Sequence, residues 1–510
     1  MLAKVHSMGV YGIEAYPVEV EVYVTRATLP HATLVGLPDA SVKESIDRVR
    51  AALRNSGYQL PTIAATVNLA PADRRKEGPV FELPIAIGLL AATDSLHLNV
   101  VGRYAVVGEL ALDGRVRPVN GCLAMALRAR EEGFDGIVVP VDNAHEAGVV
   151  TGLQVIAVSH LAEAAGFLSG AQILKPVRLD MDHVFQASRS YEVDMSDVQG
   201  QHHVKRALEV AAAGAHNILM IGPPGAGKSM LAQRLCTILP ALTLEESLQT
   251  TMIYSVSGLL ESGRSLMAVR PFRSPHHSVS TAGLVGGGAH PKPGEISLAH
   301  HGVLFLDELP EFMHSALESL RQPLEEGRVT ISRAQMSVTY PAEFMLVAAM
   351  NPCPCGNYTD PRRECRCTPR QIHTYRRRIS GPLLDRIDIH ADVPPLEYRD
   401  MATSRPAEGS KAIRERVSVA RERQRKRFQG LPFFTNSRMQ RRHVRQYCQL
   451  DDDGKLLLRQ AMDTLGFSAR AYDKILKLAR TLADLEGSEP ILPHHVSEAI
   501  NYRTLDRRLE

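Results

Sequence analysis

The sequence contains no run of apolar residues long enough to cross a membrane, since none approaches the roughly 18 residues that such a helix needs. Its first residues lack a charged segment that leads into an apolar one, so we expect no secretory signal. The formal net charge is only +3, and any contact with nucleic acid must therefore come from local basic patches. These absences predict a cytoplasmic protein that does not bind membranes.

Cysteine is scarce and unevenly placed. The chain has 7 cysteines, an odd number, which suits a reducing compartment better than a disulfide framework. Four of them form two Cys-x-Cys pairs, Cys353 with Cys355 and Cys365 with Cys367. Four thiolates can close a tetrahedral zinc site, although this spacing is tighter than the usual C-x₂-C. The alternative is free cysteines in a mobile loop, which the liability of exposed thiols disfavours.

A length of 510 residues predicts about three domains, each able to bury its own core. In the N-terminal region, residues 18–24 alternate like a strand and residues 41–56 have the apolar face of a helix, which predicts an α/β or α+β domain there. We expect an α+β domain over 1–175, a linker over 176–190, a central domain over 191–395 and a helical domain over 396–510.

The most specific motif is a phosphate-binding loop that follows the apolar run 218–221. It fits G-x-x-x-x-G-K-[ST], in which glycines let the backbone approach phosphates and the next helix offers its N–H groups. Lys228 would reach the β- and γ-phosphates of ATP, and Ser229 would ligate Mg²⁺. The alternative is an ordinary glycine-rich turn before a helix. The predicted binding residues are Gly222, Pro223, Pro224, Gly225, Ala226, Gly227, Lys228 and Ser229.

Two further apolar runs predict buried strands that end in polar residues. The run 302–306 ends at Asp307 and Glu308. Asp307 would hold Mg²⁺, and Glu308 would polarise the attacking water. The run 344–350 ends at Asn351, whose amide would orient that water. An Asn that opens a turn before proline is the alternative for Asn351.

Arg386 ends the segment Gly-Pro-Leu-Leu-Asp-Arg. We interpret it as an arginine finger that reaches the γ-phosphate bound by a neighbouring subunit. Such a finger has no use in an isolated monomer, so it implies a ring. The alternative is a surface salt bridge with Asp385 or Asp388.

In this order, the phosphate loop, the Asp-Glu strand, the Asn-Pro pair and the Leu-Leu-Asp-Arg segment resemble an AAA+ ATPase. The stretches 272–277, 286–288 and 293–300 resemble the magnesium-chelatase-like branch. Over essentially the whole chain, the sequence resembles the ComM/YifB family. ComM members of that family act as hexameric DNA helicases that promote branch migration during natural transformation. The resemblance implies a P-loop AAA+ core with a parallel sheet flanked by helices, a helical lid, and ATP and Mg²⁺ as cofactors.

The region 1–175 is similar to the Lon-protease fold, but it lacks that family's catalytic residues. Where the family has a serine in an Asp-Gly-Pro-Ser-Ala-Gly turn, this chain has Val80 in the matching stretch 77–82. The partner lysine of the family falls near Met125. Valine cannot attack a carbonyl and a thioether cannot act as a base, so we expect no protease activity. The domain would then serve as a scaffold or contact module.

Two segments of the core carry the predicted DNA contacts. The segment 326–340 predicts a hairpin, and in related ATPases such hairpins line the central pore; a solvated hairpin tip is the alternative. The loop 353–378 is rich in arginine and suits a polyanion, although it could also be solvated or bind a subunit's acids. The candidate DNA-binding residues are Arg333, Gln335, Arg376 and Arg377.

An insertion over 243–300 separates the phosphate loop from the acidic strand. It contains His276 and His277, for which we favour packing or phosphate contact over a metal, because no partner lies at ligand spacing. In the C-terminal region, Arg470 lies in the first turn of a predicted helix. The resemblance implies that Arg470 contacts the γ-phosphate bound by its own chain. The alternative is a cation at an unfavourable helix start.

We therefore expect an ATP-driven hexameric motor that acts on single-stranded and branched DNA in natural transformation and homologous recombination. A chelatase-type AAA+ subunit that remodels a protein partner is the alternative. A regulatory protein that docks through its inactive N-terminal domain is a third reading. Stimulation of ATP hydrolysis by DNA would separate the first from the other two.

Overall fold

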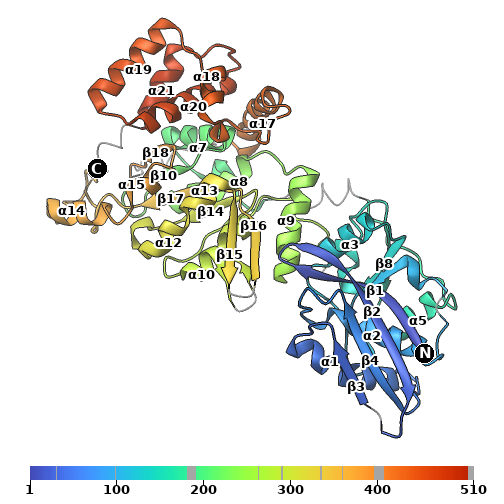
Figure 1. Ribbon diagram of the computed structural model, residues 1–510. Helices are drawn as coiled ribbons and strands as arrows, with labels where there is room; N and C mark the ends of the chain where they lie inside the picture. Colours follow the sequence, from blue (N-terminus) through green and yellow to red (C-terminus); the bar gives the residue numbers. More distant parts are fainter. Residues whose placement is uncertain are drawn as a thin grey trace. The chain divides into compact units, whose positions relative to one another are not determined.

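The computed structural model describes residues 1–29, 31–97, 99–180, 191–261, 263–288, 291–333, 336–358, 360–395 and 407–503. Contacts within the chain divide it into two compact units (Figure 1). Each unit has its own apolar core. The first comprises Met1–Arg189 together with Leu244–Ala268. The second comprises Ser190–Thr243 together with Val269–Glu510.

The first unit contains a four-stranded sheet in the order β1-β2-β4-β3 and a three-stranded parallel sheet in the order β5-β8-β9. In β2, valines at alternate positions are buried in the core while the residues between them are more exposed, as expected for a strand with one covered face. The strands are β1 (Leu2–Tyr11), β2 (Glu14–Arg26), β3 (His31–Val35), β4 (Ile63–Ala70), β5 (Tyr104–Val106), β6 (Glu109–Leu110), β7 (Val116–Arg117), β8 (Gly136–Pro140) and β9 (Gln154–Val158).

Helices and short 3₁₀ turns complete this unit. Helix α1 (Ala40–Asn55) is capped at its N-terminus by Asp39, whose side chain accepts a hydrogen bond from the Val42 N–H at 2.7 Å. Val80 and Met125 are buried core side chains, 6% and 1% exposed. The remaining elements are η1 (Pro79–Phe81), α2 (Glu82–Ala92), η2 (Val101–Arg103), α3 (Cys122–Glu131), η3 (Val141–Asn143), α4 (Ala144–Ala147), α5 (Leu161–Leu168) and α9 (Leu244–Ser257).

Helix α9 is far from the other helices of this unit in the sequence, yet it belongs to the unit's core. The Ser255 hydroxyl donates to the buried Glu146 carboxylate at 2.6 Å, and Asn143 donates to the other carboxylate oxygen at 2.6 Å. Burial raises the pKa of Glu146, while these two donors oppose the shift. Within the expected insertion 243–300, the stretch Leu244–Ala268 therefore packs with the N-terminal unit and not with the ATPase core.

The second unit is built on a five-stranded parallel sheet in the order β11-β14-β17-β10-β18 (Figure 1). This sheet, the flanking helices and the helical C-terminal part confirm the predicted α/β fold class with a P-loop core. Three of its strands consist only of buried residues, as in a sheet covered on both faces. The strands are β10 (Ile218–Ile221), β11 (Phe272–Arg273), β14 (Val303–Leu306), β17 (Met345–Met350) and β18 (Ile389–Asp392).

The register of β10 against β18 defines two opposite edges of this sheet. Ile218 pairs with Ile389, and Ile221 pairs with Asp392. Segments that follow β10 therefore start at the carboxyl edge, whereas segments that precede β18 end at the amino edge. Because a strand rises about 3.3 Å per residue, the three residue intervals from Ile218 to Ile221 separate the two edges by about 10 Å.

The expected hairpin is confirmed as β15 (Arg328–Arg333) paired with β16 (Met336–Pro341), and it extends away from the sheet (Figure 1). The smaller β12 (Gly286–Gly287) pairs with β13 (Lys292–Pro293). The other elements of the core are η4 (Met195–Asp197), α7 (His202–Gly214), α8 (Lys228–Ile238), α10 (Thr281–Val285), α11 (Glu295–Leu298), η5 (Leu309–Glu311), α12 (His314–Ser319), α13 (Arg321–Glu326), α14 (Pro369–Arg376) and α15 (Gly381–Leu384).

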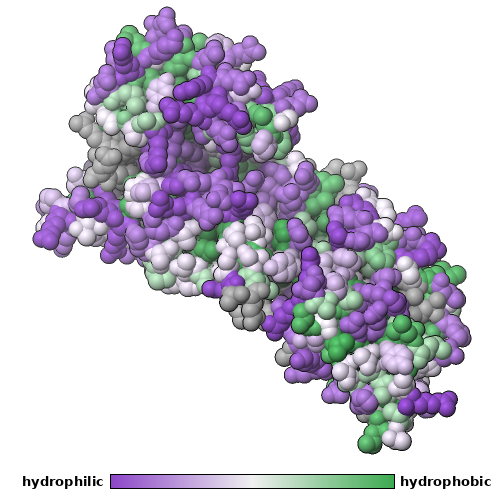
Figure 2. Space-filling view, in the orientation of Figure 1, coloured by the Kyte–Doolittle hydropathy of each residue, from purple (hydrophilic) through white to green (hydrophobic). Residues whose placement is uncertain are grey.

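The C-terminal part of this unit is helical, as expected. The surface of this helical part that is visible in Figure 2 is mostly hydrophilic. No helix of the described residues is both long and apolar enough to cross a membrane. The elements are α17 (Ser410–Arg427), η6 (Asn436–Arg438), α18 (Arg441–Tyr447), α19 (Asp452–Leu465), α20 (Ala469–Glu486) and α21 (Pro493–Asn501).

The attachment of α9 can be tested through Ser255. Ser255→Ala removes a donor from the buried Glu146 carboxylate, which should lower the free energy of opening α9 by about 1–3 kcal/mol. Hydrogen–deuterium exchange in α9 should accelerate accordingly. Ser257→Ala is the control, because that hydroxyl donates only to the Ile253 carbonyl of its own helix. Equal exchange in the two variants would contradict this role for Ser255.

Candidate active site

The phosphate loop begins where β10 ends and closes where α8 begins. Gly225 and Gly227 have φ angles of +78° and +88°, which glycine adopts without strain. A Cβ atom on Gly222 would lie 2.2 Å from the Val393 carbonyl oxygen, so only glycine fits there. The first turn of α8 then presents its free N–H groups and the positive end of the helix dipole at the loop.

Lys228 is the first residue of α8, and its side chain folds back into the loop. The ammonium group donates to the Gly222 carbonyl at 2.7 Å and to the Pro223 carbonyl at 3.0 Å. Burial lowers the pKa of Lys228, and the carboxylates of Asp307 and Glu308 oppose that shift. A cation is thus held where the loop would enclose the phosphates.

Two acidic residues follow β14. The Ser229 hydroxyl donates to one oxygen of Asp307 at 2.5 Å, so the two expected Mg²⁺ ligands face each other. Oxygen ligands of this kind are what Mg²⁺ prefers, and the residues present fit the ion. Glu308 has a φ of +53°, a strained conformation for a residue with a side chain. Its side chain is 53% exposed and therefore accessible to a reactant.

Asn351 follows β17 and completes the cluster. Its amide oxygen accepts a hydrogen bond from the Lys228 ammonium at 3.1 Å. The strands β10, β14 and β17 are parallel neighbours, so their carboxyl ends meet at one edge, where α/β proteins bind their ligands. The structure thus brings the phosphate loop, both carboxylates and the amide together, as their order in the sequence predicts.

Sequence reasoning did not predict that His277 lies beside Glu308. Its Nδ1 atom lies 3.3 Å from the Glu308 carboxylate, and its ring lies 4.0 Å from that of His276. Packing or phosphate contact was the expectation for both histidines. His277 follows β11, which pairs with β14, and β14 ends next to Glu308. The order of these strands brings the two residues together, and that order is not visible in the sequence.

Arg386 lies at the amino edge of the sheet, before β18, and interacts with its own chain. It forms a salt bridge with Glu325 and donates to the Arg321 carbonyl at 3.2 Å and the Pro382 carbonyl at 2.6 Å. Its side chain is only 16% exposed. The alternative of a salt bridge to Asp385 or Asp388 is therefore not what the structure shows, since the carboxylate partner is Glu325.

Arg470 is not placed at the phosphate loop of its own chain. It pairs with Asp385 at 2.6 Å, directly beside Arg386 and at the amino edge of the sheet. The expected contact with the γ-phosphate of the same chain therefore needs correction. The physical reason is the strand register, which puts the segment before β18 and the loop after β10 at opposite edges. The Arg470 side chain is 72% exposed.

Asn217 is a second residue that the motifs did not reveal. Its side-chain amide donates to the Arg386 carbonyl at 2.9 Å, and its amide oxygen accepts from the Leu346 N–H at 2.9 Å. It thus ties the start of β10 to β17 and to the backbone of Arg386. A polar residue at the entrance of a buried strand was the available signal.

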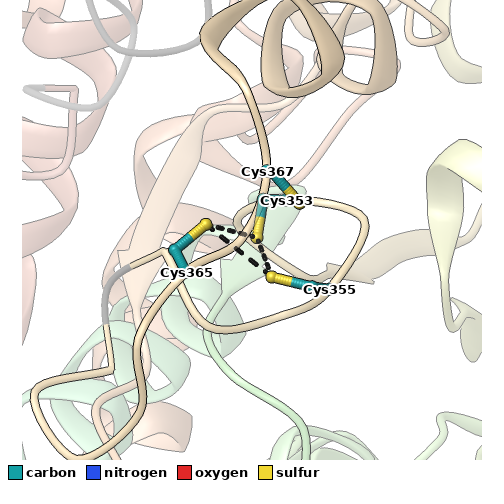
Figure 3. A group of neighbouring side chains, drawn as sticks. All are labelled: Cys353, Cys355, Cys365 and Cys367. Carbon is teal, nitrogen blue, oxygen red and sulfur yellow. Dashed lines mark hydrogen bonds between the residues drawn. The ribbon is translucent and has the colours of Figure 1, made fainter.

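The four clustered cysteines do converge, as the spacing predicts (Figure 3). The sulfur of Cys353 lies 3.4 Å from that of Cys355 and 3.7 Å from that of Cys365. These separations are too long for a disulfide and close to the roughly 3.8 Å between thiolates that share a tetrahedral zinc ion at about 2.3 Å. All four sulfurs lie within 4.8 Å of one another. The donor set therefore fits zinc.

The protonation of these thiols is uneven. Backbone N–H groups of Asn357 and Arg366 lower the pKa of Cys355 to about 6, which favours a thiolate. Burial raises the pKa of Cys353 to about 12. A metal ion would favour thiolates at all four positions, because only the deprotonated sulfur ligates.

A second group of potential ligands comprises Glu486, His494 and His495. The Leu492 N–H donates to Nδ1 of His495 at 2.9 Å, so the proton of a neutral ring sits on Nε2. That N–H donates to the Glu486 carboxylate. With both nitrogens already used, His495 acts as a helix-capping hydrogen-bond partner and not as a metal ligand.

The predicted DNA contacts fall into three groups. Arg333 is exposed at the end of β15, and Arg377 is exposed after α14. Arg376 instead braces its own loop, because it donates to the Pro352 carbonyl at 3.2 and 3.1 Å and lies 5.4 Å from the centre of the Tyr358 ring. Gln335 lies outside the described residues.

Comparison with known proteins agrees with this geometry. Residues 194–401 match the family described as magnesium chelatase, subunit ChlI; residues 20–143 match subunit ChlI of Mg-chelatase, and residues 407–503 match the ChlI C-terminal family. The chain is 46% identical to the protein YifB of Escherichia coli (strain K12), across all of this chain and 98% of that protein. The chain belongs to the ComM/YifB family of magnesium-chelatase-like proteins.

Two further relatives bear on function. The competence protein ComM of Haemophilus influenzae is 44% identical across all of this chain and 99% of that protein. The magnesium-chelatase 67 kDa subunit of Chlorobaculum tepidum is 28% identical, across 31% of this chain and 23% of that protein. The ComM/YifB likeness thus extends over the whole chain, whereas the likeness to that subunit is local.

The roles of the site residues can be separated by two substitutions. Glu308→Gln should retain ATP and Mg²⁺ binding but lose hydrolysis, because Lys228, Ser229 and Asp307 remain in place. Lys228→Ala should lose nucleotide binding itself, because the loop loses its cation. Equilibrium binding of a fluorescent ATP analogue and phosphate release measure the two properties. Loss of binding in a folded Glu308→Gln variant would contradict the assignment.

Proposed function

We propose that this protein is a ring-forming ATPase that moves along single-stranded and branched DNA. The observation that carries the ATPase part is the convergence of Lys228, the Ser229–Asp307 pair, Glu308 and Asn351 at one edge of a parallel sheet. Few other chemistries require a glycine loop, a buried lysine and paired carboxylates in this arrangement.

Each residue has a role that its position supports. Lys228 and the N–H groups of α8 stabilise the negative charge that develops on the transferred phosphoryl group. Glu308, exposed at the end of its strand, accepts a hydrogen bond from the attacking water and orients it, and Asn351 does the same from the next strand. Mg²⁺, held by Ser229 and Asp307, would neutralise charge on the β- and γ-phosphates.

The ring follows from the two edges of the sheet. Arg470 pairs with Asp385, which precedes Arg386 in the chain, so both arginines belong to the amino edge, opposite the phosphate loop of their own chain. We therefore assign both to the γ-phosphate bound by the neighbouring subunit, as arginine fingers acting in trans. Glu325 and Asp385 would hold them until the next subunit docks.

Two observations support DNA as the substrate of the motor: exposed arginine side chains and sequence similarity to a competence protein. Arg333, at the end of an extended hairpin, and Arg377 offer exposed guanidinium groups to phosphates. The competence protein ComM of Haemophilus influenzae matches the entire chain, which favours a role in natural transformation and recombination. A hexamer that promotes branch migration fits this assignment. We also assign one zinc ion to the four clustered cysteines.

The function is tested most simply by the rate of ATP hydrolysis with and without DNA. Single-stranded or forked DNA should stimulate hydrolysis several-fold, and Glu308→Gln should abolish both rates. An ATPase that ignores DNA but responds to a protein partner would contradict the DNA motor and favour a chelatase-type remodelling subunit. That outcome is the one that the local likeness to a magnesium-chelatase subunit would support.

Mixing two inactive variants tests the shared site. Lys228→Ala lacks the phosphate loop's cation, and Arg386→Ala lacks the finger, so each should be inactive alone. Mixed rings contain boundaries with one intact loop and one intact finger, and some ATPase activity should return. Absence of recovery at every mixing ratio, with mixed rings verified by native mass spectrometry, would refute a finger that acts in trans.

The salt dependence of DNA binding tests how DNA is held. Contacts to phosphates predict a log–log slope of about one unit for each neutralised phosphate. Arg333→Ala should reduce that slope by about one unit and weaken binding to all sequences alike. Arg328→Ala is the matched control, because it lies at the base of the same hairpin and pairs with Glu326. An effect that depends strongly on base sequence would argue against backbone contacts.

A further inference from the structure

The cysteine loop starts within two residues of the active site. Asn351, whose amide accepts from Lys228 at 3.1 Å, is followed by Pro352 and then by Cys353. Cys353 is buried, and its sulfur lies 3.4 Å from that of Cys355 and 3.7 Å from that of Cys365. Only Pro352 separates the first cysteine from the residue that contacts the phosphate-binding lysine, so the position of Cys353 restrains that of Asn351.

The same loop touches the phosphate loop directly. Gly356 follows Cys355, and a Cβ atom on Gly356 would lie 2.5 Å from Cδ and 2.7 Å from Cγ of Pro224. Such distances are shorter than real Cβ contacts, so the backbone of Gly356 rests against the Pro224 ring. Gly356 also has a φ of +82°, and its N–H donates to the Cys353 carbonyl at 3.0 Å. The tight turn from Cys353 to Gly356 thus packs against Pro224 of the phosphate loop.

Other contacts hold the far end of the loop in place. Arg376 of α14 donates twice to the Pro352 carbonyl, which ties the helix after the cysteines back to the residue before them. The sulfurs of Cys355 and Cys365 lie 3.7 Å apart and join the two Cys-x-Cys arms. Bringing these two arms together costs conformational entropy, which a bond between the arms must offset. A metal ion that binds all four thiolates supplies that closure.

We propose that the four-cysteine cluster positions the phosphate loop: metal binding pins Gly356 against Pro224 and fixes Asn351 beside Lys228. The proposal rests on the proposed ATPase function and adds a second control point to it. Loss or oxidation of the thiolate site should weaken nucleotide binding, although the four cysteines lie outside the phosphate loop. Gly356 and the cysteines are then positioning residues and not catalytic ones.

The test measures zinc content and nucleotide affinity in the full-length protein. We expect about one zinc per chain and a dissociation constant for a fluorescent ATP analogue that rises about tenfold or more when Cys353→Ser and Cys355→Ser are combined. Circular dichroism reports whether this variant folds. DNA affinity without nucleotide is measured in parallel, because a loop that served only DNA would change that value alone.

A second variant avoids removal of the metal site. Gly356→Ala keeps all four cysteines, so it should retain zinc but bind nucleotide about tenfold more weakly, since its Cβ must displace Pro224. In a protein that already carries Pro224→Ala, the ring is absent, so Gly356→Ala should weaken nucleotide binding by less than it does in the wild-type protein. Gly430→Ala is the matched control: its φ is +81°, but a Cβ there meets nothing within 4 Å, so the backbone strain is similar and the clash is absent.

Each outcome decides the question. Nucleotide affinity that stays at the wild-type value in both the folded double-cysteine variant and Gly356→Ala would overturn this inference while leaving the ATPase proposal intact. Wild-type protein that contains no metal would overturn it too. A wild-type protein that binds no nucleotide would overturn the proposed function and this inference together. Weak binding by Gly430→Ala equal to that of Gly356→Ala would assign the effect to backbone strain and overturn the contact with Pro224.

Discussion

The parallel register of β10 between β17 and β18 determines where the chemistry of this protein lies. Residues that follow a strand of this sheet collect at its carboxyl edge, and residues that precede one collect at its amino edge. The phosphate loop, the Asp-Glu pair and Asn351 belong to the first edge. The amino edge holds Asn217 and Arg386. It also holds Arg470, through the salt bridge of Arg470 with Asp385. In the ring that we propose, each edge supplies half of an ATPase site, and the two halves meet when one copy packs its amino edge against the carboxyl edge of another.

Burial and charge act together at the carboxyl edge. Lys228 is held inside the loop by two carbonyls and one amide, and the nearby carboxylates oppose the effect of burial on its pKa. Donors fixed in this way need little reorganisation when negative charge develops on a phosphate. Because Asn351 leads directly into the cysteine loop, the geometry of this lysine depends on how firmly that loop is closed. Asn217 makes a comparable link at the other edge, where it holds the Arg386 backbone.

The sequence predicted the elements whose local pattern reflects a chemical requirement. The phosphate loop, the buried strands that end in Asp307 and Asn351, the hairpin after α13 and the convergence of four cysteines all depend on neighbouring residues in the chain. What it could not predict depends on strand order and on packing between distant segments. His277 meets Glu308 only because β11 lies beside β14. Arg470 pairs with Asp385, and α9 joins the N-terminal unit through Ser255 and Glu146; none of these partners is close in sequence.

The central claim is that one ATP site is built from two copies of the chain. A cryo-electron microscopy structure of the Glu308→Gln variant with ATP, Mg²⁺ and forked DNA tests it most directly. The account predicts a ring in which Arg386 and Arg470 of one copy have left Glu325 and Asp385 and lie within hydrogen-bond distance of the γ-phosphate held by Lys228 of the next copy. ATP bound in the loop while both arginines keep their partners within their own chain would contradict it.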